Sequence, residues 1–173
     1  MLIWIIGLSG SGKTTLANAI AASIKKTHSN LVLLDGDDVR NVFQNDLGYS
    51  IDDRRINATR LCSLGKFLSE QGLIVITPIL SIFPDSRSWN KKEVKSYFEV
   101  YIDTPIEQLL ARDSKGLYGR YFRGEMQNVV GMDIEFIPPA NPNLVIRNDK
   151  SLDYLLSYAD SIAERAIADS NAI

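Results

Sequence analysis

Apolar residues along the chain form five short runs, and the segments between these runs carry apolar residues at helical spacing. The runs, each too short for a helix, occupy residues 2–6, 31–34, 73–77, 97–102 and 144–146. The helical segments cover about 15–27, 51–71, 89–96, 106–113 and a closing helix from 151. Strands that alternate with helices in this way favour a parallel sheet covered by helices. The pattern therefore predicts a three-layer α/β/α protein with a five-stranded parallel sheet.

The long helix over 51–71 carries recognisable signals at both ends. Ser50 and Asp53 resemble a capping box at its start, and Gly72 is a typical residue to end it. The apolar positions that we expect to face the core are Ile56, Leu61, Leu64 and Leu68. The sequence thus predicts a long, well-delimited helix packed on the sheet.

Three other segments have weaker patterns. Residues 41–49 indicate a short helix and turn, and residues 79–87 indicate a loop. Residues 114–142 hold basic and aromatic side chains among several glycines, without a long periodic segment. Long irregular segments in compact proteins usually serve as lids or binding loops. We therefore expect an ordered lid over 114–142.

Composition narrows the class of protein. With 173 residues, 45% of them hydrophobic, the chain is expected to form a single domain over 1–173. A net charge of −2 argues against a nucleic-acid partner, and no apolar run approaches the length of a membrane span. One cysteine, Cys62, fits a cytoplasmic location and a place in the core. The only histidine, His28, lies at a helix end, so we expect any general base to be a carboxylate.

The strongest motif joins the first strand to the first helix and reads Gly7-Leu8-Ser9-Gly10-Ser11-Gly12-Lys13-Thr14. Glycine, four residues and Gly-Lys-Thr form the pattern of a phosphate-binding loop. Its glycines let backbone N–H groups surround an anion, and the following helix adds the positive end of its dipole. Lys13 is expected to reach the β- and γ-phosphates, and Thr14 to offer its hydroxyl to Mg²⁺. The motif in this context predicts a nucleoside-triphosphate enzyme rather than a chance Gly/Ser loop.

Acidic residues follow the second strand in the order Asp35-Gly36-Asp37-Asp38. Because α/β sheets bind ligands at the carboxyl ends of their strands, these carboxylates can lie beside the phosphate-binding loop. An acidic cluster beside a glycine also fits a helix cap, and the residues alone leave both interpretations open. The third strand ends in Thr77-Pro78 without an acid. Asp35 is therefore the better candidate for a carboxylate near a metal.

Several motifs, in the same order along residues 1–149, resemble those of adenylylsulfate kinases. Besides the phosphate-binding loop, they are Leu34-Asp35-Gly36-Asp37, Asp46-Leu47-Gly48-Tyr49-Ser50, Tyr101-Ile102-Asp103-Thr104-Pro105, Arg112-Asp113, Lys115-Gly116-Leu117-Tyr118 and Gly124-Glu125 with Asn128. The resemblance implies a P-loop kinase fold with a lid segment, and it suggests a homodimer. It also implies transfer of the γ-phosphoryl group of ATP, with Mg²⁺, to the ribose 3′-hydroxyl of adenylylsulfate.

The resemblance also implies roles for individual residues. Catalytic positions match Lys13, Asp35, Asp37 and Ser81, with Asp37 as the expected base and with Asp35 and Thr14 near the metal. Positions that bind ATP match Gly7, Ser9, Gly10, Ser11, Gly12, Lys13, Thr14, Thr15 and Arg112. Positions that bind the acceptor nucleotide match Asp37, Arg40, Tyr49, Arg54, Asn57, Ser81, Lys115, Leu117 and Val129. The arginines are expected to neutralise the phosphosulfate, and Tyr49 to stack on the base.

The chain departs from the family pattern on the acceptor side. Ser81 is followed by Ile82-Phe83-Pro84, where the family has a proline, an aromatic residue and an arginine. Tyr121-Phe122-Arg123 replaces small residues around an arginine. Val129 stands where the family has a phenylalanine that completes an aromatic clamp on adenine. Losing one stacking face costs about 1–3 kcal/mol, so we expect weaker discrimination between bases.

These departures leave a second acceptor open. A related class of kinases phosphorylates the 3′-hydroxyl of cytidine diphosphoramidate during capsular-polysaccharide modification, and its smaller base fits Val129. Adenylylsulfate is the first hypothesis, and the cytidine compound is the alternative. A nucleotide-binding regulator without catalysis is a third hypothesis, but Lys13, Asp35 and Asp37, whose loss would favour it, are all present.

Overall fold

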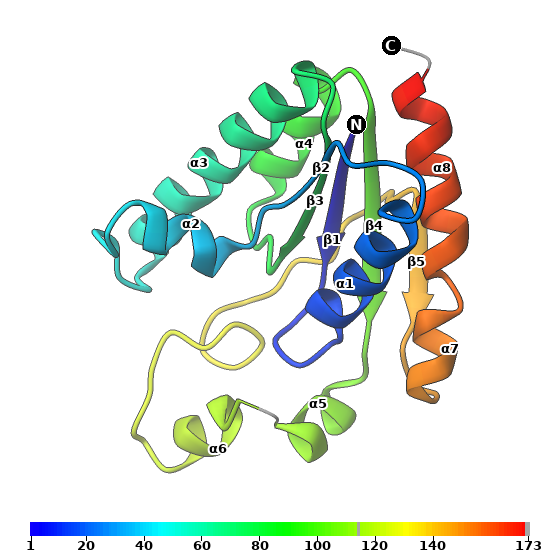
Figure 1. The fold of residues 1–173 in the computed structure, drawn as a ribbon. Helices are drawn as coiled ribbons and strands as arrows, with labels where there is room; N and C mark the ends of the chain where they lie inside the picture. Colours follow the sequence, from blue (N-terminus) through cyan, green and yellow to red (C-terminus); the bar gives the residue numbers. More distant parts are fainter. Residues whose placement is uncertain (114, 172–173) are drawn as a thin grey trace.

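The predicted strands form one sheet in a computed structural model that describes residues 1–113 and 115–171. All neighbouring strands pair in parallel, in the order β2-β3-β1-β4-β5. The strands are β1 (Leu2–Ile6), β2 (Leu31–Leu33), β3 (Ile74–Ile79), β4 (Tyr97–Asp103) and β5 (Leu144–Arg147). Their bounds lie close to the predicted runs, and the predicted three-layer arrangement of helices around a parallel sheet is confirmed (Figure 1).

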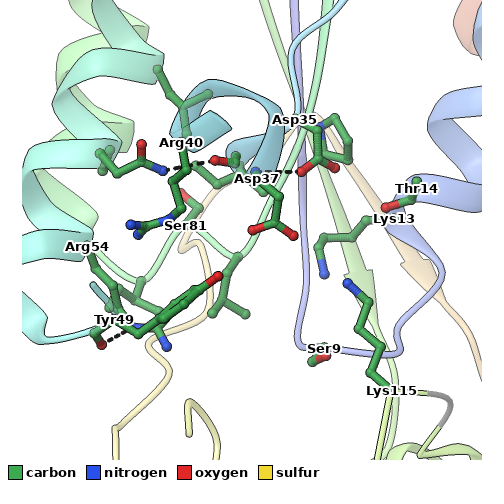
Figure 2. A pocket seen from close by; sticks show the side chains of 18 of the residues that line it. Ser9, Lys13, Thr14, Asp35, Asp37, Arg40, Tyr49, Arg54, Ser81 and Lys115 are labelled. Carbon is green, nitrogen blue, oxygen red and sulfur yellow. Dashed lines mark hydrogen bonds between the residues drawn. The ribbon is translucent and has the colours of Figure 1, made fainter. Parts of the chain in front are cut away.

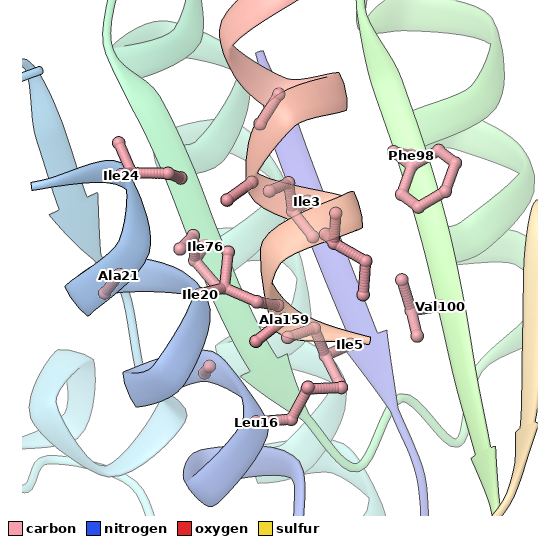
Figure 3. Packing of buried hydrophobic residues seen from close by; sticks show 14 of the residues in the cluster. Ile3, Ile5, Leu16, Ile20, Ala21, Ile24, Ile76, Phe98, Val100 and Ala159 are labelled. Carbon is pink, nitrogen blue, oxygen red and sulfur yellow. The ribbon is translucent and has the colours of Figure 1, made fainter. Parts of the chain in front are cut away.

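The central strand β1 supplies both faces of the core, because successive side chains of a strand point to opposite faces. Ile3 and Ile5 pack against α1 (Lys13–Ile24) and α8 (Ala159–Asn171), as Figure 3 shows. Trp4 points to the other face, toward α3 (Ile51–Glu70). All five residues of β1 are fully buried. The strand that leads into the phosphate-binding loop is thus held from both sides.

The start of α3 confirms the predicted cap, whereas one of its predicted core positions is wrong. The Ser50 hydroxyl accepts a hydrogen bond from the Asp53 N–H and donates to the Asp53 carboxylate. Ile56, however, is 47% exposed. The inward face of the helix is built by Ala58, Leu61 and the predicted core cysteine Cys62. Leu61, Leu64 and Leu68 pack on the sheet as predicted, so Ile56 is the one predicted position of the four that faces outward.

Two helices begin earlier than the sequence pattern indicates. Helix α2 (Gly36–Val42) starts at the acidic cluster instead of at residue 41. It ends before Gln44 and Asn45, whose positive φ angles of 59° and 53° are incompatible with a continued helix. Helix α4 (Pro84–Glu93) starts inside the predicted 79–87 loop, because proline fits the first turn of a helix.

The closing helix is divided in two. Helix α7 (Leu152–Leu156) begins at Ser151, whose side chain accepts from the Tyr154 N–H, and α8 follows after a turn. The two segments share one apolar face, which packs on α1. Apolar spacing alone did not reveal the break, since the turn preserves the direction of that face.

The predicted lid follows α5 (Ile106–Arg112) and contains a short helix, α6 (Leu117–Phe122), that the sequence pattern did not reveal. Asp113 caps α6 by accepting from the N–H groups of Tyr118 and Gly119. Figure 1 shows α5 and α6 beyond the carboxyl ends of the strands, opposite the end of the molecule where β1 begins and α8 ends. Within the part of the chain that the structure describes, no helix combines the length and apolar character needed to cross a membrane.

Candidate active site

The phosphate-binding loop runs between β1 and α1 and depends on its glycines. Gly10 and Gly12 have φ angles of 78° and 94°, which side chains other than glycine rarely adopt. A Cβ atom at Gly12 would also lie 2.6 Å from the Leu155 side chain. The loop therefore has the tight backbone that the motif predicts, with its N–H groups gathered at the start of α1.

Lys13 is the lysine of the phosphate-binding loop. Its Nζ donates to the Leu8 carbonyl oxygen over 2.8 Å. Burial of the ammonium and the charge of Lys115 lower the pKa of Lys13 to about 8, against the opposing influence of Asp35 and Asp37. Figure 2 shows the ends of Lys13 and Lys115 beside each other. Both lysines line the same cavity, and together they form an electrostatic environment suited to a polyphosphate.

The first two acids after β2 have different positions at the start of α2. Asp35 is the N-cap, and its Oδ1 accepts from the Asp37 N–H at 2.9 Å. Burial raises the pKa of the Asp35 carboxyl. Asp37 lies two residues further on, in the first turn of α2, and its carboxylate reaches into the space between Lys13 and Tyr49 in Figure 2. Asp35 thus caps α2 and also lines the cavity together with Asp37, so the helix cap and a place in the candidate site, which the sequence left as alternatives, are compatible.

The oxygen donors near the loop fit a hard divalent cation. Thr14 and Asp35 line the same cavity, and hydroxyl and carboxylate oxygens are ligands that Mg²⁺ prefers. Among residues 1–113 and 115–171, no group of three or more His, Cys, Asp or Glu side chains could hold a metal by itself. A magnesium ion here would thus need phosphate oxygens and water to complete its coordination, as Mg²⁺ in nucleotide sites commonly does.

Two arginines and a tyrosine form the opposite side of the site. The Arg40 Nη1 donates to the carbonyl oxygens of Leu47 and Gly48, at 3.2 and 2.7 Å. The Tyr49 ring faces both guanidinium groups, with its centroid 4.7 Å from the Arg40 Cζ and 5.4 Å from the Arg54 Cζ. Burial and the charge of Arg40 lower the pKa of Arg54. This side of the cavity is consequently cationic and aromatic.

Asn57 and Ser81 complete this side from α3 and from the segment after β3. Asn57 is buried and donates from Nδ2 to the Gly36 carbonyl oxygen at 3.3 Å, which ties α3 to the start of α2. Ser81 is also buried and has a positive φ of 51°. Both residues come from separate elements yet line the same cavity.

A single cavity of about 350 Å³ joins the two sides. The predicted residues that line it are Ser9, Gly10, Gly12, Lys13, Thr14, Thr15, Asp35, Asp37, Arg40, Tyr49, Arg54, Asn57, Ser81 and Lys115. Acidic groups thus lie between a cationic phosphate-binding side and a second cationic side. Such an arrangement can accommodate two anionic ligands at once.

The remaining predicted residues lie outside the cavity lining. Gly7 and Ser11 belong to the loop but are buried. Arg112 is exposed and donates to the Gln108 side chain. Leu117 and Val129 belong to an apolar cluster with Leu109, Tyr118 and other residues. Val129 is only 1% exposed and thus packs inside the lid instead of lining the cavity.

Two buried supports of the loop were missed at the sequence level. Asn148, after β5, donates from Nδ2 to the Ser11 carbonyl oxygen at 2.9 Å. The Tyr118 hydroxyl, from α6, donates to the Ser9 carbonyl oxygen at 3.0 Å. Both contacts join residues more than 100 positions apart, so no local pattern could reveal them.

Comparison with known proteins shows the family of this chain. The family model described as adenylylsulphate kinase matches residues 1–147. A cytidine diphosphoramidate kinase from Campylobacter jejuni is 42% identical over 150 residues, which cover 85% of each chain. A probable adenylyl-sulfate kinase from Archaeoglobus fulgidus is 38% identical over 150 residues, covering 87% of this chain and 97% of that protein.

Solved structures show the same likeness. The structure of the APS kinase CysC from Mycobacterium tuberculosis, in complex with AMPPNP and APS, matches this fold with a TM-score of 0.81 at 32% identity. The match covers 99% of this chain and 97% of that one. The family model, the relatives and the shared fold together show that this chain is a kinase of the adenylylsulfate kinase family.

Proposed function

We propose that this kinase transfers the γ-phosphoryl group of ATP to the ribose 3′-hydroxyl of a nucleotide whose phosphate carries a further substituent. The observation that carries this proposal is the position of Asp37 in the cavity. Its carboxylate lies between Lys13, on the phosphate-binding side, and the Arg40, Tyr49 and Arg54 group on the other side (Figure 2). A hydroxyl placed there would have a proton acceptor beside it and a phosphate in front of it.

The ATP side of the proposal is supported by the loop. Its backbone N–H groups and Lys13 would hold the β- and γ-phosphates, and Thr15 lines the same wall. Thr14 and Asp35 would hold Mg²⁺, which neutralises charge on the phosphates when bound. Lys115 is exposed and reaches the phosphate side from the lid segment, so it would add a second cation to the transferring group.

In the transfer, the 3′-oxygen forms a bond to the γ-phosphorus while the bond from that phosphorus to the β,γ-bridging oxygen breaks, and ADP leaves. The proton of the 3′-hydroxyl passes to the Asp37 carboxylate. Asp35 is engaged as the cap of α2, which leaves Asp37 as the carboxylate available for this role. Phosphoryl transfer depends mainly on positioning and charge neutralisation, and these groups supply both.

The acceptor side is suited to an anionic nucleotide. Arg40 and Arg54 now donate to backbone carbonyl oxygens and face Tyr49, so an incoming phosphate substituent would replace neutral acceptors by an anion. Adenylylsulfate is the first candidate, because the family model and the relative from A. fulgidus carry the name of that activity. Its base would stack on Tyr49, which is 57% exposed.

Cytidine diphosphoramidate is the second candidate, and two specific observations favour it. The relative from C. jejuni that bears this substrate's name is 42% identical to the chain. The family resemblance also implies that adenylylsulfate kinases carry an aromatic residue for adenine at the position of Val129, so this chain lacks that ring, while Val129 itself is buried outside the cavity lining. A pyrimidine demands less stacking area than a purine, so the loss of that aromatic residue weakens binding of cytosine less.

The test is a comparison of the two acceptors with the purified kinase, ATP and Mg²⁺ at matched concentrations. Formation of the 3′-phosphorylated product is followed, and kcat/KM is reported for each acceptor. A kcat/KM for adenylylsulfate that is at least about tenfold higher supports the first candidate, and a kcat/KM that is higher for cytidine diphosphoramidate by the same factor supports the second. Turnover of neither nucleotide, in protein that binds ATP, would contradict the proposed function and favour a nucleotide-binding regulator.

A further inference from the structure

The hydroxyl of Ser81 is bonded to the central strand of the sheet. The indole Nε1–H of Trp4 donates to the Ser81 Oγ over 3.1 Å. Trp4 is fully buried in β1, three residues before the phosphate-binding loop, and its register partner in β3 is Thr77. The strand that leads into the ATP-binding loop therefore also contacts the serine on the acceptor side of the cavity.

The backbone of Ser81 is fixed by a second buried group. Arg87, which is 5% exposed, donates from Nη1 to the Ser81 carbonyl oxygen at 2.8 Å. The fully buried Glu99 forms an ion pair with Lys91, and its negative charge also acts on the Arg87 guanidinium. Ser81 keeps its positive φ of 51° under these constraints. Backbone and side chain of this serine are thus held from behind, away from the cavity.

The hydrogen bond from Trp4 determines whether the Ser81 hydroxyl can serve a ligand as a donor or as an acceptor. A serine hydroxyl has one hydrogen to donate and lone pairs to accept. The indole N–H can only donate, so it occupies a lone pair and leaves the hydroxyl hydrogen free. Within residues 1–113 and 115–171, the hydrogen bond from Trp4 is the only one that the Ser81 hydroxyl makes. Since Ser81 lines the cavity, its hydrogen is available to a ligand there.

We propose that Trp4 is a positioning residue that sets Ser81 as a hydrogen-bond donor to the acceptor nucleotide, at an oxygen of its substituted phosphate. This inference rests on the proposed function, because it needs an anionic acceptor on that side of the cavity. Arg40 and Arg54 line the same side and would hold the same group. Trp4 itself touches no ligand; it acts through Ser81 and, as part of β1, keeps that serine in register with the phosphate-binding loop.

The test is a double-mutant cycle with Trp4→Phe and Ser81→Ala, read as KM for the better acceptor and KM for ATP. Trp4→Phe keeps an aromatic ring in the core and removes the N–H. We expect the acceptor KM to rise about fivefold in Trp4→Phe, as loss of one neutral hydrogen bond predicts, with the ATP KM unchanged. In the Ser81→Ala background, Trp4→Phe should change the acceptor KM by less than about twofold. Trp89→Phe, at a tryptophan that is 38% exposed and outside the cavity lining, is the matched control.

The outcomes separate positioning from simple packing. Equal acceptor KM values for Trp4→Phe and the unchanged kinase would overturn the inference, and so would the same loss in both backgrounds. Turnover of neither acceptor by the unchanged kinase is a different result, since it contradicts the proposed function before any variant is compared.

A spectroscopic measurement covers the case in which Trp4→Phe fails to fold. The chain has two tryptophans, so ¹H–¹⁵N spectra contain two indole signals, and Trp89→Phe assigns the signal of Trp4. We expect Ser81→Ala to shift the Trp4 signal upfield, and addition of acceptor nucleotide to shift it in the unchanged kinase only. A Trp4 signal that is identical with and without the Ser81 hydroxyl would overturn the inference.

Discussion

At the scale of single residues, Asp35 and Asp37 lie two positions apart but have different environments. Asp35 has extended backbone angles of −80° and 148° and uses its carboxylate to cap α2. Asp37 belongs to the first turn of that helix and is exposed in the cavity. In the proposed function, Asp35 would therefore lie on the metal side, and Asp37 would be free to take a proton.

Asp37→Asn removes the proposed proton acceptor while keeping the size of the side chain. We expect kcat to fall at least about 100-fold, because positioned general bases contribute on the order of 10²–10⁴ in rate. The dissociation constant of ATP should change by less than about twofold, since the amide leaves the loop intact. Steady-state kinetics and calorimetric ATP binding measure both. Asp38→Asn, at the exposed neighbouring acid, is the control, and a near-normal rate for Asp37→Asn would exclude it as the base.

Lys13 should take up a proton when ATP binds. Its pKa of about 8 in the free protein means that roughly half of the side chains are neutral at pH 8, and a bound triphosphate raises that pKa. We expect an uptake of about half a proton at pH 8, measured by calorimetry in buffers of different ionisation enthalpy. Lys13→Arg, which stays protonated, should show none. Uptake of equal size in both proteins would show that another group titrates.

The same pKa shift has a consequence for stability without ligand. The unfolded chain, with the ordinary lysine pKa of 10.5, binds more protons than the folded protein between about pH 8 and 10.5. The contribution of Lys13 to the free energy of unfolding therefore rises with pH through this window. Below about pH 8 it stays at its unfavourable value, because both states carry the charge.

At the scale of elements, the lid is built around its own polar contacts. The Asp133 carboxylate accepts from the N–H groups of Asn128 and Val129. Arg54, from α3, donates to the Asn128 carbonyl oxygen at 2.9 Å. One arginine of the acceptor side therefore also holds the lid. An acceptor that draws Arg54 toward its phosphate would release this contact, which couples binding to the position of the lid.

Val129→Phe tests whether the lid brings position 129 to the base. The side chain is 1% exposed and packs with Leu109 and Tyr118, so a larger ring has to leave this cluster. We expect the ratio of kcat/KM for adenylylsulfate to that for cytidine diphosphoramidate to rise about tenfold, as one added stacking face predicts. Thermal unfolding is measured alongside. An unchanged ratio with a lower Tm would identify Val129 as a packing residue only.

At the scale of the whole molecule, the sheet separates two apolar layers and leaves the site at one end. Residues of β1 alternate between the layer of α1 and α8 and the layer of α3. The phosphate-binding loop and the start of α2 both follow the carboxyl ends of strands, opposite the termini in Figure 1. The core on both faces of the sheet therefore fixes the position of the candidate site, and the residues of the site come from elements on different faces of the sheet.

The single cysteine offers a measure of how tightly these layers are held. Cys62 is 4% exposed, its thiol lies against the Ser86 carbonyl oxygen of α4, and burial raises its pKa to about 12. We expect its reaction with an aromatic disulfide at pH 8 to be at least about 1,000-fold slower than in the unfolded chain. Ser161→Cys in a Cys62→Ala chain provides the exposed control. Comparable rates for the two cysteines would mean that α3 and α4 separate readily.

Local sequence determined the elements and the phosphate-binding loop. The five apolar runs, the glycines that allow φ angles of 78° and 94°, and the Ser50 cap all depend on residues close together in the chain. Backbone sterics and neighbouring hydrogen bonds control such features, so a pattern of residue types is enough to predict them. For the same reason, the local motifs were enough to indicate the adenylylsulfate kinase family, to which the comparisons show that the chain belongs.

Only the tertiary structure decided how those elements meet. It buried Val129 inside the lid, exposed Ile56, and joined Trp4 to Ser81 across 77 positions and Asn148 to Ser11 across 137. Such contacts depend on strand register and on which faces pack together, and these are set by the sum of many weak interactions over the whole core. The sequence therefore determined which groups the site contains, whereas the packing of the sheet and helices decided which of them face the cavity.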